Sequence, residues 1–112
     1  MAVTSELIEE IKESVYLGIK RRSYEIAVGT GTPSSSGLGN EIARKKVMEI
    51  MRIGDIVKIF TVFTETEAND TLTEVALYDR FGNLLLYTEI SPPVTKDSSI
   101  KLMTGLEITI SI

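Results

Sequence analysis

The sequence of 112 residues contains no cysteine, histidine, tryptophan or glutamine. The absence of cysteine excludes disulfide bonds, thiolate nucleophiles and zinc sites built on cysteine. The absence of histidine removes the side chain that most often acts as a general base or a metal ligand. Catalysis would have to rely on carboxylates, lysine, serine or tyrosine. We therefore expect a protein that is not an enzyme and that holds no cofactor and no metal ion.

Positive charge is scarce as well. Twelve lysines and arginines stand against 16 acidic residues, and the formal net charge is −4. Nucleic-acid binding needs a basic surface that neutralises phosphates. The two basic triplets, at 20–22 and 44–46, are short and have acidic neighbours. We therefore expect no nucleic-acid partner.

Long hydrophobic runs are also missing. No apolar stretch approaches the ~20 residues of a membrane-spanning helix, and the polar start is unlike a signal peptide. The sequence predicts a protein made in the cytoplasm, without a membrane partner, in which residues 1–112 form a single domain. Hydrophobic residues nevertheless make up 43% of the chain. In so small a domain this surplus favours a homo-oligomer that covers apolar surface.

Residues 4–20 are predicted to form a helix. Thr4 or Ser5 can cap its N-terminus, glutamates follow, and basic residues stand at its other end, as the helix dipole favours. Apolar residues recur every four positions and form one stripe, which comprises Leu7, Ile11, Val15 and Ile19. The simpler expectation is that this stripe packs on the domain's own sheet, and the alternative is a contact between copies of the helix.

The remainder, 24–112, is predicted to be a β module. Its strands are expected at 24–28, 56–64, 72–78, 84–90 and 100–112. Strand 56–64 is apolar on both faces and should be central or covered on both sides. Proline cannot donate a ladder hydrogen bond, so Ser91-Pro92-Pro93 is expected to end strand 84–90. Alternation from 100 to 112 predicts a half-buried strand with Gly105 as a candidate bulge.

Segment 41–53 is ambiguous. Its composition of alanine, arginine, lysine, methionine and glutamate favours a helix. The following Gly54-Asp55 and the strongly β-prone run after it favour a hairpin. Taken together, the pattern predicts a mainly β fold: an antiparallel β-sandwich or barrel of about six strands with an N-terminal α-helix.

Two polar stretches are predicted to be exposed loops. Residues 29–40 are rich in glycine and serine, but they lack the lysine of a P-loop and the third glycine of a dinucleotide-binding loop. Residues 79–83 form a hairpin loop in which Gly82 and Asn83 can adopt positive φ. The side chains that these loops offer for contact with a partner are Thr30, Ser34, Ser35, Ser36, Arg80 and Phe81.

Acidic side chains are frequent between 65 and 79. Their spacing pairs no two of them as in a glycosidase, and it lacks the ligand alternation of a calcium loop. Glu74 differs because it lies between apolar residues. If it is buried it needs a partner, for which Arg44 and Lys96 are the candidates. We expect Glu74 to have a structural role that fixes strand register.

The order of segments from 26 to 112 carries a resemblance. These segments are IAVGTGT (26–32), LGNEIARK (38–45), EANDTLTEVALYD (67–79), GNLL (82–85) and SPPVTK (91–96). Together they resemble a family of small virion structural proteins of tailed bacteriophages and related viruses, of the tail-fibre or tail-associated type. The resemblance implies an all-β module present in several copies in the virus particle. It favours a strand over 46–53 and implies that Arg44, Glu74 and Lys96 are framework positions.

The expected function is therefore that of a non-enzymatic virion structural component, associated with the tail, fibre or baseplate. It would assemble with itself and with other virion proteins through its β-sandwich. Two alternatives remain open. One is a receptor- or carbohydrate-binding tip that uses loops 30–40 and 79–83, and the other is a capsid decoration protein.

Overall fold

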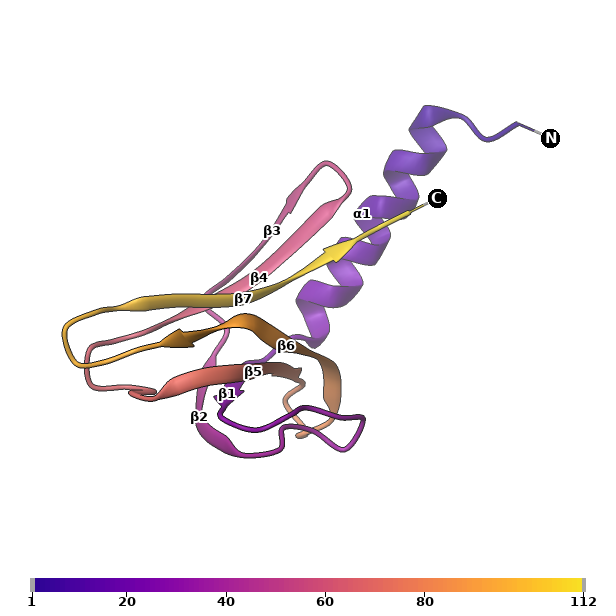
Figure 1. The fold of residues 1–112 in the computed structure, drawn as a ribbon. Helices are drawn as coiled ribbons and strands as arrows, with labels where there is room; N and C mark the ends of the chain where they lie inside the picture. Colours follow the sequence, from indigo (N-terminus) through magenta and orange to yellow (C-terminus); the bar gives the residue numbers. More distant parts are fainter. Residues whose placement is uncertain (1, 112) are drawn as a thin grey trace.

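The computed structural model describes residues 2–111 as one helix followed by seven antiparallel strands (Figure 1). The elements are α1 Ser5–Arg22, β1 Glu25–Gly29, β2 Glu41–Lys46, β3 Glu49–Ile53, β4 Ile56–Phe63, β5 Thr71–Tyr78, β6 Leu84–Thr95 and β7 Leu102–Thr109. One sheet has the order β2-β1-β5-β6, and the other has the order β3-β4-β7. The predicted mainly β fold with an N-terminal helix is confirmed, as a two-sheet, sandwich-like arrangement rather than a closed barrel.

The core lies between the two sheets. Strand β4 is the middle strand of its sheet, as its apolar pattern predicts, and every second residue of it, from Val57 to Phe63, is buried. The opposite sheet contributes β1 and β5, which are its two central strands. The buried apolar side chains that join the sheets are Ile26, Val28, Val57, Ile59, Phe63, Leu72, Val75, Leu77, Leu106 and Ile110.

Segment 41–53 forms two strands that belong to different sheets. Strand β2 pairs with β1, and β3 pairs with β4 through a hairpin in which Gly54 has φ +62°. The preference for strands is confirmed, and the helix that the local composition favours does not form. Strand pairing with β1 and β4 supplies backbone hydrogen bonds and burial that outweigh intrinsic helix propensity.

Strand β6 does not end at the two prolines, so that prediction is wrong. It continues to Thr95, and the Ser91–Pro92 peptide bond is cis. Leu72 pairs with Val94 and Glu74 pairs with Glu89, so Thr73 alone stands opposite residues 90–93. Because β6 is an edge strand with a bulge at this place, the missing proline N–H groups interrupt no regular ladder.

The terminal strand β7 has the predicted alternation. Thr104, Leu106 and Ile110 are buried, and their odd-numbered neighbours are exposed. Gly105 forms no bulge, because it pairs in register with Phe60, and a Cβ atom there would lie 2.8 Å from the Cβ of Phe60. Glycine is needed here for close approach of the two strands. The strand ends at Thr109, and Ile112 lies outside the described residues.

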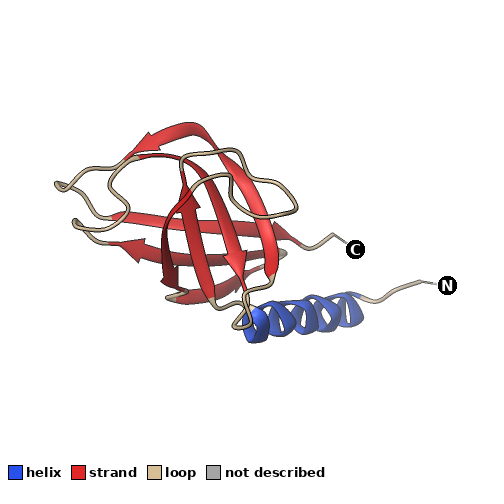
Figure 2. Ribbon diagram, turned by 90° about the horizontal axis from the view of Figure 1, so that it is seen from below, coloured by secondary structure: helices blue, strands red, loops and turns tan. Residues whose placement is uncertain are grey.

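Helix α1 extends the molecule beyond the sheets. The oxygen Oγ1 of Thr4 accepts a hydrogen bond from the N–H of Leu7, and the helix continues to Arg22, two residues past the predicted end. The molecule measures 53 × 28 × 27 Å, and its surface of 6814 Å² exceeds the area of about 6,100 Å² expected for this mass. No residue of α1 is buried. Figure 2 shows the helix outside the two sheets rather than between them.

Within residues 2–111 no helix has the length and hydrophobicity that crossing a membrane requires.

Candidate functional site

Loop 30–40 is held by the carboxylate of Glu74. Glu74 is fully buried on β5, and its oxygens accept hydrogen bonds from the backbone N–H groups of Gly31 (2.8 Å), Gly39 (2.7 Å) and Asn40 (2.8 Å). The burial agrees with the sequence prediction, but the predicted cationic partner is wrong, and the contacts of Glu74 anchor a loop, whereas the predicted role was to fix strand register. Backbone amides compensate the buried charge because carboxylates accept such bonds strongly.

Three glycines make this anchor possible. A Cβ atom on Gly29 would meet the Glu74 carboxylate, and one on Gly31 or Gly39 would lie within 3 Å of the facing loop backbone. The hydroxyl of Thr73 donates to the carbonyl of Gly31 at 2.7 Å. The loop is therefore fixed at its base and irregular in shape.

The predicted contact residues of this loop lie at different depths. Thr30 is at the base, where its hydroxyl accepts a hydrogen bond from the side chain of Asn40 at 2.7 Å. Ser34, Ser35 and Ser36 form the exposed tip, which is closed by paired backbone hydrogen bonds between Ser34 and Gly37. The tip offers hydroxyl groups and no charged side chain.

Loop 79–83 is organised by Asp79. Its carboxylate accepts hydrogen bonds from the side chain of Asn83 and from the N–H groups of Phe81 and Asn83, and these bonds hold the pKa of Asp79 below its ordinary value. Gly82 has the predicted positive φ, +82°. The ring of Phe81 is 82% exposed, and the neighbouring Arg80 is also exposed. The turn therefore presents an aromatic side chain in a fixed backbone.

The three predicted framework residues do not meet. Glu74 binds the loop, as described above. Arg44 lies on β2, where its guanidinium stacks 3.9 Å from the ring centre of Tyr78 and binds Glu41 at 2.7 Å. This hydrogen bond raises the pKa of Arg44. Lys96 is at the far end of the sandwich, so each residue supports a separate part of the body.

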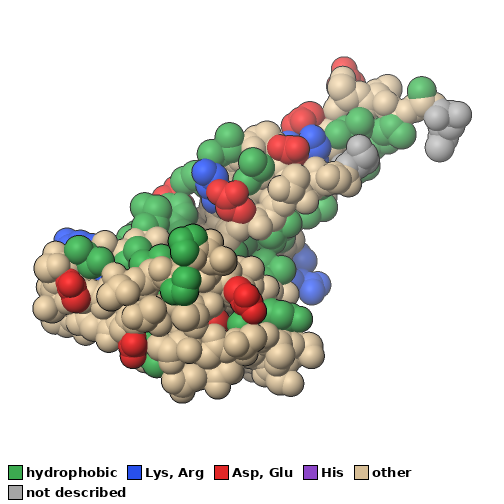
Figure 3. All heavy atoms as spheres, viewed as in Figure 1, with side chains coloured by type: hydrophobic (Ala, Val, Ile, Leu, Met, Phe, Trp, Pro, Cys, Tyr) green, Lys and Arg blue, Asp and Glu red, His purple; other side chains and the backbone are tan. Residues whose placement is uncertain are grey.

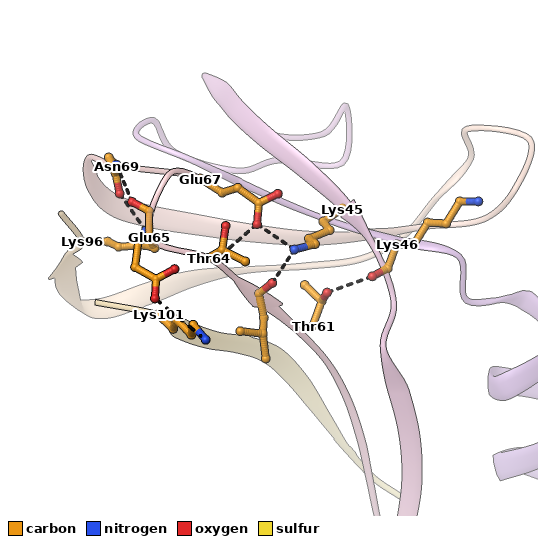
Figure 4. Close-up of polar contacts among 10 residues, drawn as sticks. Lys45, Lys46, Thr61, Thr64, Glu65, Glu67, Asn69, Lys96 and Lys101 are labelled. Carbon is orange, nitrogen blue, oxygen red and sulfur yellow. Dashed lines mark hydrogen bonds and ion pairs between the residues drawn. The ribbon is translucent and has the colours of Figure 1, made fainter. Parts of the chain in front are cut away.

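That far end is closed by polar contacts between loops 64–70 and 96–101, and we call it the closed end (Figure 4). The buried Lys96 donates through Nζ to Asn69 at 2.7 Å. Lys45 reaches from β2 to the Val62 carbonyl on β4 and to the Glu67 carboxylate, which joins the two sheets. The bond from Lys45 is the main cause that lowers the pKa of Glu67 to about 2. Lysines thus engage Glu65 and Glu67 at this end, and no group of three potential metal ligands occurs within residues 2–111.

The opposite end is covered by α1, and we call it the helical end. Arg52 on β3 binds Glu9 at 2.7 Å and Glu13 at 3.1 Å, and the Tyr16 hydroxyl donates to the carbonyl of Ile50 at 3.2 Å. These contacts attach the helix to an edge strand. The sequence does not reveal the role of Arg52. Glu13 precedes it by 39 positions and Glu9 by 43, and no local spacing pattern connects residues so far apart.

The predicted apolar stripe of α1 is only partly covered. Ile19 packs against the core, but Leu7, Ile11 and Val15 are 46%, 38% and 38% exposed. Figure 3 shows hydrophobic side chains along the part of the helix that projects from the body. Packing on the domain's own sheets therefore accounts for Ile19, at the C-terminal end of the stripe, and leaves the other three residues open.

Comparison of the chain with protein-family models, with curated proteins and with solved structures finds no match.

Proposed function

We propose that this chain is a non-enzymatic structural subunit of a virus particle, associated with the tail, fibre or baseplate, which assembles with copies of itself. The observation that carries the proposal is the open apolar stripe on α1. Exposed apolar side chains in a contiguous row are typical of surfaces that a partner covers. The assignment to a virion rests on the resemblance of the segment order between 26 and 112.

The rest of the molecule supports a structural role. Loop 30–40 is fixed on Glu74, and the closed end is joined by Lys45 and Lys96. In these contacts two carboxylates, Glu67 and Glu74, and two lysines hold strands and loops together. A rigid body with one uncovered apolar helix face is suited to repeated assembly.

The first test is the mass of the protein in solution. Gel filtration with light scattering at micromolar concentration should give a multiple of 12.4 kDa. The double variant Ile11→Ser/Val15→Ser should shift the protein to the monomer. Met103→Ser is the matched control, because Met103 is 66% exposed on β7 and lies away from the helix. A wild-type protein of 12.4 kDa at all concentrations would overturn self-assembly.

The second test is location. Mass spectrometry of purified virus particles that encode this chain should detect it at a fixed stoichiometry to the other tail proteins. Its presence only in the lysate, with none in the particles, would contradict the virion assignment even if the protein is oligomeric.

A receptor- or carbohydrate-binding tip is the second candidate function. It is favoured by Phe81, whose exposed ring stands on the turn that Asp79 organises. Aromatic rings supply large contact area at low entropic cost, and sugars stack on them. A glycan array should then show binding that Phe81→Ala abolishes and Met103→Ala retains. No binding by the wild-type protein at high density would argue against this function.

A capsid decoration protein would share the architecture and differ in the particle component with which it co-purifies.

A further inference from the structure

Two apolar grooves run along α1 and meet at Val15. What we call the outer groove is a shallow, open surface on the projecting half of the helix, lined by Leu7, Ile11 and Val15 with Glu10 and Ser14 beside them. The base groove, of about 350 Å³, lies between the C-terminal half of the helix and the sheets. Val15 and Gly18 line it from the helix, and Leu85, Leu86 and Ile108 line it from β6 and β7.

Both grooves lie on the face of the helix that docking to β3 leaves open. At 3.6 residues per turn, Leu7, Ile11, Val15 and Gly18 fall within an arc of about 80°, and Glu9 and Glu13 lie on the opposite side of the helix. Because Arg52 holds that opposite side, the apolar face is directed away from β3.

The charges of the helix differ between its two halves. Residues 5–13 contain four glutamates and one lysine, and residues 20–22 are all basic. Arg21 and Arg22 line the base groove, and Glu10 lines the outer groove. The outer half of one helix is therefore complementary in charge, as well as in hydrophobicity, to the base of another.

We propose that two copies of this chain associate through an antiparallel pair of α1 helices with the two-fold axis at Val15. The acidic outer half of each helix then lies in the base groove of the other copy, with Leu7 near Leu85 and Leu86 and with Glu10 near Arg21. Such an isologous contact closes on itself and buries both grooves at once. The proposal rests on the self-assembly proposed above and specifies its geometry.

A parallel arrangement satisfies these observations less well. It would place Glu10, the glutamate that lines the outer groove, at the level of Glu10 of the neighbour and the basic ends beside one another, and it would leave each base groove empty. Like charges in contact oppose association, and opposite charges set the orientation of paired helices. The antiparallel pair avoids the repulsion and fills the groove.

A charge-swap series tests the orientation. Glu10→Arg and Arg21→Glu should each weaken self-association at least tenfold in sedimentation equilibrium. The double variant Glu10→Arg/Arg21→Glu should recover most of the wild-type affinity, since the pair is restored across the two-fold axis. Glu89→Arg, an exposed position on β6, is the control and should have no effect. Circular dichroism must show unchanged helix content. A double variant as weak as the single variants would overturn the proposal.

Disulfide trapping gives an independent readout, because the chain has no cysteine of its own. Glu10→Cys and Arg21→Cys proteins, one of them carrying a mass tag, are mixed and oxidised. The antiparallel pair predicts mainly the mixed 10–21 disulfide. Dominant 10–10 and 21–21 products would show a parallel pair, which contradicts this inference and leaves self-assembly intact. If the wild-type protein is monomeric, both proposals fail.

Discussion

The two ends of the sandwich are held together by different kinds of interaction. At the closed end, long polar side chains from the loops and from β2 make partly buried hydrogen bonds, and Lys96 is only 2% exposed. At the helical end, α1 has no buried residue and is attached through ion pairs whose glutamates are half exposed. Exposed ion pairs contribute little, typically about 0–1 kcal/mol each. The sandwich is thus held together by buried contacts, whereas the contacts of the helix lie largely at the surface.

The largest difference between the sandwich and the helix is expected when a large apolar side chain in each is shortened to alanine. Phe63→Ala, in the core between the sheets, should lower the free energy of unfolding by about 3–5 kcal/mol, because it leaves a cavity. Leu17→Ala, on the exposed helix, should change it by less than about 0.5 kcal/mol. Chemical denaturation at low protein concentration measures both values. Similar losses for the two variants would mean that the helix is as well packed as the body.

The second-largest loss of stability is expected when the carboxylate that anchors loop 30–40 is removed. Glu74→Ala leaves the N–H groups of Gly31, Gly39 and Asn40 without their acceptor and should destabilise the protein by about 3 kcal/mol. Glu89→Ala is the matched control on the neighbouring strand, since Glu89 pairs with Glu74 in register and is exposed. Hydrogen exchange should show faster exchange throughout 31–40 in the first variant only. Unchanged exchange there would show that the loop needs no anchor.

Glycine substitutions should change stability in opposite directions in the sandwich and in the helix. Gly82→Val should destabilise the body by about 1 kcal/mol or more, because Gly82 has φ +82°. Gly18→Ala should stabilise the monomer by up to about 1 kcal/mol, because Gly18 is helical and no atom lies within 4 Å of the added Cβ. Thermal melting of dilute protein distinguishes the two. An unchanged melting temperature for Gly82→Val would contradict the assigned turn.

The smallest effect is expected at the attachment of the helix. The hydrogen bond from Arg52 lowers the pKa of Glu9 from its ordinary value of 4.5. The stabilisation from this pair is therefore complete above about pH 4.5 and is lost as the pH falls through the lowered pKa. In Arg52→Gln, NMR titration should return the pKa of Glu9 towards 4.5, and amides of α1 should exchange faster. A Glu9 titration that is the same in both proteins would show that Arg52 does not hold the helix in solution.

Much of the β architecture follows from local pattern. The alternation in β7 and the two apolar faces of β4 determine which side chains face the core, and Gly82 marks its turn. The sequence predicts too short a strand β6, because the prolines lie in a bulge on an edge strand and edge position depends on the order of strands in the sheet. Segment 41–53 is ambiguous because its two halves pair in different sheets, β2 with β1 and β3 with β4, and local composition does not show this division.

The polar contacts could be predicted only in part. Burial of Glu74 follows from its apolar neighbours on β5, but its partners are backbone amides of a distant loop, which no side-chain pattern reveals. The attachment of α1 through Arg52 likewise joins residues about 40 positions apart. The stripe on α1 was visible in the sequence. Its partial exposure was not, because it depends on how far the helix projects past the sheets.

The nest of amides around Glu74 has a consequence for relatives of this chain. The carboxylate can accept these hydrogen bonds only if positions 29, 31 and 39 carry no side chain. A Cβ atom at any of them would lie within 3 Å of Glu74 or of the loop backbone. We expect the four positions to change together during evolution: a homologue that replaces the glutamate should also lose the glycines and carry a loop of different length.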